Sequence, residues 1–171
     1  TAQVNTALAD ITIAFKFNEK TQQSEIYLNE ENVEYVIRDL VIAEKVSDVA
    51  AIREVRSFAV AQQQQMGEKK GIVMDGRDIG TTVFPDAELK FFMTADIAVR
   101  VERRYMEMFE KNPNVSIEDV KANLEMRDYI DSNREISPLR KAADAIELDN
   151  SNISIEEQLD LALDIAKKKI E

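Results

Sequence analysis

The stretch Gly71-Ile-Val-Met-Asp-Gly-Arg-Asp-Ile-Gly-Thr81 carries the strongest fold signal in this chain. Its first five residues, 71–75, are a short apolar run that ends in an acidic residue, and a loop with two glycines follows. Similar apolar runs recur at 89–94 and 145–149, each ahead of a segment with a helical pattern. Short strands that alternate with helices are typical of a parallel sheet. The sequence therefore predicts an α/β fold with strands at all three runs.

The helices of this region are predicted over residues 96–110, 116–130 and 155–169. Ser116 and Ser154 each precede an apolar residue and then acidic residues, which is the pattern of a helix N-cap. We expect both serines to accept hydrogen bonds from backbone N–H groups in the first turn of the helix that follows.

The first 66 residues have a different pattern. Residues 10–28 contain two short alternating runs around the polar turn Asn18-Glu19-Lys20, which predicts an antiparallel hairpin. Residues 33–66 predict two helices that meet near Val46-Ser47. Gly67 is expected just beyond the second helix, at the position where a left-handed glycine often ends a helix.

Composition indicates one compact, helix-rich domain with a small insertion. The 171 residues are 44% hydrophobic and 32% charged, and they include only 4 glycines and 3 prolines. No apolar run is long enough to span a membrane, and no signal peptide precedes Thr1. We therefore expect a cytoplasmic protein that does not insert into a membrane.

The residue inventory excludes several kinds of chemistry. The chain has no cysteine, which excludes disulfides, thiolate nucleophiles and cysteine-based zinc sites, and it has no histidine, the commonest general base. The net charge of −11 disfavours binding to a nucleic acid. A small anionic ligand would need a local cluster of arginines. Phosphoryl transfer fits this inventory, because it depends mostly on positioning and on neutralising charge.

Arg77 and Asp78 are the first candidate site residues. They follow the predicted strand 71–75, and open α/β sheets bind their ligands beyond the carboxyl ends of strands. A guanidinium suits phosphate oxygens, and a carboxylate can accept a hydrogen bond from an exocyclic amine. An ordinary strand-to-loop turn with a surface ion pair fits the same residues equally well.

Two further clusters lie on predicted helices. Arg127, Asp131 and Arg134 are spaced i, i+4 and i+7, which places them on one helical face. Arg103 and Arg104 extend a cluster that begins at Arg100, and such a cluster could close over a transferring phosphate. Solvent-exposed faces with ion pairs would have the same spacing. Ser47 and Arg56 are candidates too, although a helix cap and a surface arginine are the simpler interpretations.

A family resemblance changes the balance between these interpretations. Residues 71–95 closely resemble the core of bacterial cytidylate kinases, and the resemblance continues through Arg100–Arg104, 125–134, Ser137-Pro-Leu and 142–145. The block Asp75–Thr81, followed by Val83–Ala87, is highly specific. The resemblance implies the fold of nucleoside monophosphate kinases. That fold has a P-loop NTPase-type parallel sheet flanked by helices, an insertion with a small antiparallel sheet, and a mobile lid.

The resemblance also implies roles for individual residues. By position, Ser47, Arg56 and Asp78 correspond to residues that recognise the cytosine ring, and Asp131 corresponds to an acceptor for the ribose hydroxyl. Arg38 corresponds to a basic position near the substrate phosphate.

The remaining arginines correspond to groups around the phosphates. Arg77, Arg127 and Arg134 match contacts to the CMP phosphate and to the transferring phosphoryl group. Arg103 and Arg104 fall at the family's lid. None of these residues is implied to be a metal ligand.

One part of the family pattern is missing. The loop Gly-x-x-Gly-x-Gly-Lys-[ST], which holds the ATP phosphates and positions Mg²⁺, does not occur in the 171 residues. We therefore interpret the chain as N-terminally truncated, without the first strand and the P-loop, by roughly a quarter of a family domain. We expect it to transfer phosphate negligibly by itself, and to be less stable or to self-associate, whereas the intact family is monomeric.

The predicted activity is that of a (d)CMP kinase, with CMP, dCMP and ATP as ligands and Mg²⁺ accompanying ATP. Residues 1–66 are predicted to form the nucleotide-binding region, and residues 67–171 the kinase core, with the lid around 96–115. A non-catalytic nucleotide-binding or interaction module with the same fold is the alternative. A purely structural acidic protein would leave the Gly-Arg-Asp block unexplained.

Overall fold

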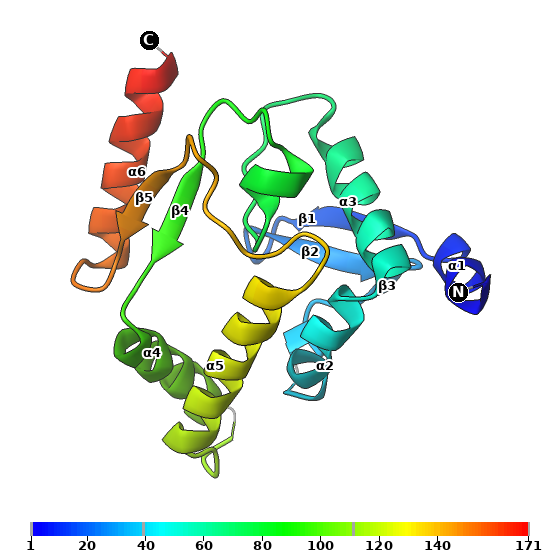
Figure 1. The fold of residues 1–171 in the computed structure, drawn as a ribbon, viewed down its shortest axis with the longest axis horizontal. Coiled ribbons are helices and arrows are strands. Elements are labelled where there is room, and N and C mark those ends of the chain that lie inside the picture. Colours follow the sequence, from blue (N-terminus) through cyan, green and yellow to red (C-terminus); the bar gives the residue numbers. More distant parts are fainter. Residues whose placement is uncertain (1, 39, 111, 171) are drawn as a thin grey trace. The chain divides into compact units, whose positions relative to one another are not determined.

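The computed structural model describes residues 2–38, 40–110 and 112–170 (Figure 1). The chain divides into two compact units. Unit 1 consists of Thr1–Met74 and Arg134–Ile136, and unit 2 consists of Asp75–Asn133 and Ser137–Glu171. None of the helices in the described ranges is long and apolar enough to cross a membrane.

Unit 1 combines a small antiparallel sheet with helices. Its elements are α1 (Ala2–Ala9), β1 (Ile13–Asn18), β2 (Gln23–Leu28), β3 (Glu31–Asn32), the 3-10 helix η1 (Val36–Arg38), α2 (Leu40–Ala50) and α3 (Arg53–Gly67). The sheet has the order β1-β2-β3, and Ile13 pairs with Leu28 at its far end. Asn18 closes the turn, because its Oδ1 accepts a hydrogen bond from the N–H of Lys20 at 2.9 Å. The predicted hairpin is confirmed.

The break between the two helices of unit 1 differs from the prediction. It falls at residues 51–52, where the N–H of Ile52 donates to the carbonyl of Val49 in a tight turn and Ile52 itself is extended. Ser47 therefore lies inside α2. Gly67 does not adopt the left-handed conformation that was expected; it is the last residue of α3, and positive φ values occur instead at Lys70 and Gly71.

Unit 2 contains a parallel pair of strands flanked by helices. Its elements are the π-helical turn η2 (Ile79–Val83), β4 (Phe91–Thr94), α4 (Ile97–Phe109), α5 (Ile117–Asn133), β5 (Ile146–Asp149) and α6 (Ile155–Ile170). Phe91 pairs with Ile146 and Thr94 with Asp149, so β4 and β5 are in parallel register. Figure 1 shows α6 lying alongside these strands. The mixed α/β fold, with one parallel and one antiparallel sheet, is confirmed.

The buried apolar core of unit 2 is small. Four aliphatic side chains are buried, one each from η2, α4, α5 and β5, namely Val83, Val101, Val120 and Leu148. One of these side chains, Val83, belongs to the turn that follows Arg77 and Asp78. Burial of apolar surface at these positions stabilises the segments that carry the candidate site residues.

The predicted strand at 71–75 is wrong. These residues have no strand structure, and the Val73 side chain is fully exposed, at 103% of its reference area. A strand exists only when a neighbouring strand pairs with its N–H and C=O groups. Among the described residues, β4 pairs with β5, and neither pairs with 71–75.

Both predicted helix caps are confirmed. Ser116 Oγ accepts from the N–H of Asp119 at 3.0 Å at the start of α5. At the start of α6, Ser154 Oγ accepts from the N–H of Glu157 at 3.1 Å, and the Glu157 carboxylate accepts from the N–H of Ser154 at 2.7 Å. The second arrangement is a complete capping box.

Candidate functional site

Arg77 and Asp78 lie immediately before the turn η2. The Asp78 carbonyl accepts hydrogen bonds from the N–H groups of Thr81, Thr82 and Val83, at 3.3, 2.9 and 3.4 Å. The turn is therefore wound tightly around the Asp78 backbone. Asp78 is buried, with 4% of the residue exposed, so a solvent-exposed turn with a surface ion pair does not describe it.

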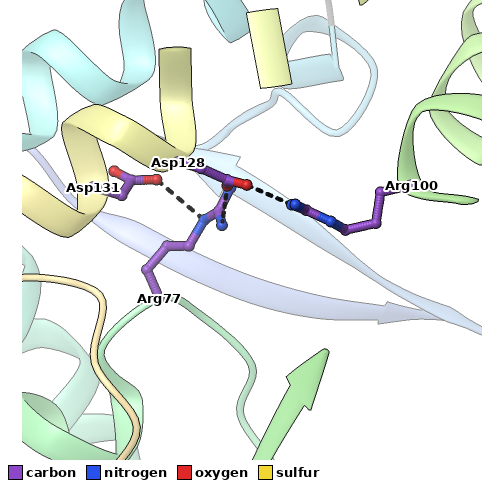
Figure 2. Close-up of polar contacts among 4 residues, drawn as sticks. All are labelled: Arg77, Arg100, Asp128 and Asp131. Carbon is purple, nitrogen blue, oxygen red and sulfur yellow. Dashed lines mark hydrogen bonds and ion pairs between the residues drawn. The ribbon is translucent and has the colours of Figure 1, made fainter. Parts of the chain in front are cut away.

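Helix α5 supplies the carboxylates that face Arg77. Arg77 Nε lies 3.2 Å from Asp131 Oδ2, and Arg77 Nη1 lies 3.2 Å from Asp128 Oδ1. Asp128 Oδ2 in turn lies 2.6 Å from Arg100 Nη1 on α4 (Figure 2). One guanidinium thus contacts two carboxylates, and one of these carboxylates contacts a second guanidinium.

The burial of Asp131 is not what a solvent-exposed face of α5 with ion pairs would show. Only 3% of Asp131 is exposed, and an aspartate is rarely buried without a partner. The ion pair with Arg77 provides such a partner. The face that carries Arg127 and Asp131 is therefore an internal charged surface of unit 2.

Arg127 belongs to the same cluster. Burial, and then the positive charge of Arg77, lower the pKa of the Arg127 guanidinium, while Asp131 acts in the opposite direction. Its Nε is buried and has no hydrogen-bond partner in the described part of the chain. The sequence spacing correctly placed Arg127 and Asp131 together, and the structure brings both to Arg77.

The arginines of α4 have different surroundings. Arg100 joins the cluster through Asp128. Arg103 binds the loop after β5, because its two Nη atoms donate to the Asn150 side chain at 2.9 Å and to the Asn150 carbonyl at 2.7 Å. Arg104 pairs with Glu107 at 3.0 Å and is close enough to Arg127 to lower the pKa of that group.

The other candidate residues belong to unit 1. Ser47 is buried within α2, with 6% exposed, and Arg56 is half-buried on α3. Arg134 follows the last residue of α5 and is half-buried. The side chain of Arg38 lies outside the part of the structure that is described; its backbone ends η1.

Asp128 was missed as a candidate, and Arg100 was noted only as the start of the α4 cluster. Asp128 lies three residues before Asp131 on α5, and this spacing places the two carboxylates on one helical face. This i,i+3 spacing was the only sequence feature that pointed to Asp128. The residues that Asp128 contacts are 51 and 28 positions away in the sequence, beyond the reach of any local pattern.

This arrangement favours binding of a compact anion. Arg77, Arg100 and Arg127 supply guanidinium groups, which form charge-assisted hydrogen bonds with phosphate oxygens. The described residues include no group of three or more acidic side chains that could hold a metal ion. What these guanidinium groups offer chemically is charge-assisted hydrogen bonding to an anion and neutralisation of its charge.

Comparison with known proteins agrees with the family resemblance found in the sequence. The family model described as "Cytidylate kinase" matches residues 2–168. A cytidylate kinase of Flavobacterium psychrophilum is 56% identical over 158 residues, which cover 92% of this chain and 70% of that protein. One from Cytophaga hutchinsonii is 53% identical over 164 residues, or 96% of this chain and 70% of that protein. One from Bacteroides thetaiotaomicron is 54% identical over 158 residues, or 92% and 69%.

Proposed function

This chain belongs to the cytidylate kinase family, and on that premise we propose that its residues serve in the transfer of a phosphoryl group from ATP to CMP or dCMP, giving ADP and CDP or dCDP. The observation that carries the proposal is the cluster of Arg77, Arg100 and Arg127 around Asp128 and Asp131 in unit 2. A cytoplasmic location is part of this proposal, since ATP and CMP are cytoplasmic metabolites.

The arginines would act on charge. In phosphoryl transfer the equatorial oxygens of the moving group carry the developing negative charge, and catalysis consists mainly of positioning and electrostatic stabilisation. Arg77, Arg127 and Arg134 are each proposed to bind the phosphate of CMP or the transferring group. Arg103 and Arg104 on α4 would belong to the lid.

The remaining residues would recognise the nucleoside. Asp78 would accept a hydrogen bond from the exocyclic amine of cytosine. Ser47 and Arg56 are also proposed to take part in recognition of the base. Asp131 would accept from the ribose hydroxyl, because a carboxylate offers about four acceptor positions. Arg38 would bind near the substrate phosphate.

Mg²⁺ would accompany ATP. The described residues do not themselves form a metal site, so they do not fit a protein-held ion. Glycine-rich loops of the Gly-x-x-Gly-x-Gly-Lys type are also missing from the 171 residues, which span about 70% of the length of the curated relatives. The roles proposed for this chain therefore concern the monophosphate and the transferring phosphoryl group.

Calorimetric titration of the full-length protein with CMP, UMP and AMP tests the proposal. CMP should bind at least ~10-fold more tightly than UMP, because a site built to pair with an amine leaves a buried polar group unpaired when the amine is missing. Asp78→Ala should remove most of this preference. Equal binding of CMP and UMP to the parent protein would contradict the roles of Asp78, Ser47 and Arg56.

A coupled assay that detects CMP-dependent ADP release tests the contribution of these 171 residues. We expect a polypeptide of these residues to release ADP negligibly, because it contains no glycine-rich loop to hold the triphosphate. A cytidylate kinase that carries the glycine-rich loop, assayed beside it, should be active. Normal turnover by the 171-residue polypeptide would contradict this expectation.

A further inference from the structure

Asp128, to which the family resemblance assigns no role, lies between two guanidinium groups. Its Oδ1 is 3.2 Å from Arg77 Nη1, and its Oδ2 is 2.6 Å from Arg100 Nη1. Figure 2 shows the three side chains in a row, with Asp131 on the other side of Arg77. Both oxygens of one carboxylate are thus used to connect α5 to α4 and to the segment before η2.

Like charges are crowded at this position. Arg77 and Arg104 both lower the pKa of Arg127, which indicates that their positive charges are close enough to repel it. Arg100 adds a fourth positive charge, against the three negative charges of Asp128, Asp131 and Glu107, the last of which pairs with Arg104. Without Asp128, Arg77 and Arg100 would lose the group that holds their guanidinium groups together. The remaining excess of positive charge suits a phosphate.

Two buried N–H groups of the cluster have no acceptor within the described residues. These groups are the Nε atoms of Arg100 and Arg127. Buried polar groups in folded proteins are nearly always hydrogen-bonded, so each exception calls for an explanation. Both Nε atoms are closed to solvent in this structure, so an anionic ligand would have to bind the part of each guanidinium that remains exposed; the Arg100 side chain is 35% exposed.

We propose that Asp128 is a positioning residue for phosphoryl transfer. It does not touch the nucleotide; it fixes the orientation of Arg77 and Arg100, and thereby makes Arg100 part of the set of arginines that bind phosphate. This inference rests on the proposed function, because it assigns the phosphate-binding role to Arg77. The orientation of the Arg77 and Arg100 guanidinium groups can also be measured without an activity assay.

The kinetic test is Asp128→Asn in the full-length enzyme. An amide has one oxygen and one NH₂ group, so it can accept from only one of the two arginines and its NH₂ faces the other. We expect kcat to fall by ~10- to 100-fold, the range for a displaced catalytic group, with KM for CMP changed by less than about threefold. Unchanged kcat would overturn the proposal.

Glu125→Gln is the matched control. Glu125 is on the same helix and pairs with Lys121 at 3.9 Å, but its side chain is 54% exposed, against 26% for Asp128. The same chemical change should leave kcat within about twofold, because exposed i,i+4 pairs contribute little.

A double-mutant cycle separates positioning from a merely structural role. In an Arg77→Met background, Asp128→Asn should lower kcat by a clearly smaller factor than in the parent enzyme, because its main target is already gone. If the two substitutions reduce kcat by independent, multiplying factors, Asp128 does not act through Arg77 and the inference fails.

Rotation of the guanidinium groups gives a readout that needs no turnover. In ¹⁵N NMR spectra of the parent protein, Arg77 and Arg100 should show separate Nη resonances, because ion pairing slows rotation about the Nε–Cζ bond. Asp128→Asn should merge the Arg100 resonances, and fast rotation in the parent would overturn the inference. A parent protein without CMP kinase activity would instead contradict the proposed function, while this spectrum would still decide whether Asp128 holds the two arginines.

Discussion

Arg127 is the single residue whose loss should affect turnover most directly. Its guanidinium lies beside Arg77, and the residue is only half-buried, so part of the side chain remains open to a ligand. We expect Arg127→Ala to lower kcat by ~10²-fold or more, the effect of removing one donor to developing charge. Steady-state kinetics of the full-length enzyme measures this, and an effect confined to KM would contradict the role.

Asp78 should affect substrate choice more than turnover. It is buried and precedes a turn that is fixed by its own backbone carbonyl, so Asp78→Ala removes a side chain without removing the turn's hydrogen bonds. We expect KM for CMP to rise and the ratio of kcat/KM for CMP over UMP to fall by ~10-fold or more. An unaltered ratio would show that another group recognises the base.

Single residues could be predicted where a local rule applied. The i,i+4 spacing of Arg127 and Asp131 placed them together, and the two serine caps followed from their position before a helix. The contacts of Asp128 could not be predicted, because its partners lie 51 and 28 positions away and only the folded backbone brings them near.

Among the elements, α6 offers the clearest test of local stability. Its capping box uses both the side chain and the N–H of Ser154. Ser154→Ala should lower the free energy of unfolding by ~1 kcal/mol, the usual cost of losing an N-cap side chain. Urea denaturation followed by circular dichroism measures the change.

Ser57→Ala is the control for this substitution. Ser57 is exposed in the interior of α3, where alanine is the better helix former, so the free energy of unfolding should stay equal or rise slightly. If Ser57→Ala destabilised the protein as much as Ser154→Ala does, the loss could not be assigned to the capping box.

Helices with a long pattern were predicted well, whereas the short apolar runs gave mixed results, since 89–94 and 145–149 contain β4 and β5 but 71–75 forms no strand. The predicted helices 96–110 and 155–169 agree with α4 and α6 to within a residue at each end. The run 71–75 is as apolar as a strand, but strand formation depends on a pairing partner that its own sequence does not specify. The break after α2 was misplaced because tight turns at a helix end leave little trace in composition.

For the molecule as a whole, a buried lysine links stability to pH. Lys90 is buried, and its Nζ donates to both oxygens of Asp144, at 2.9 and 2.7 Å, and to the Pro85 carbonyl. The hydrogen bond from Lys90 is the main reason why the pKa of Asp144 is lowered. Because the pKa is lower in the folded state, this pair stabilises the protein above pH ~4, the pKa of an unfolded aspartate, and stops doing so as pH falls further.

The corresponding prediction concerns Asp144→Asn. The substitution should destabilise the protein at pH 7, where the carboxylate is charged, and should reduce the loss of stability between about pH 5 and pH 3. Urea unfolding across this pH range measures both effects. A variant with the same acid dependence as the parent would show that other carboxylates determine the response.

The way the two units share the chain affects how the protein can be divided. Unit 1 includes Arg134–Ile136, which lie between two stretches that belong to unit 2. The exposed pair Lys69-Lys70 is a natural trypsin site, yet a single cut there leaves those three residues on the C-terminal fragment. An N-terminal fragment prepared in this way would lack part of its own unit. We therefore expect the two fragments to fold by associating with each other, and not as two independent domains.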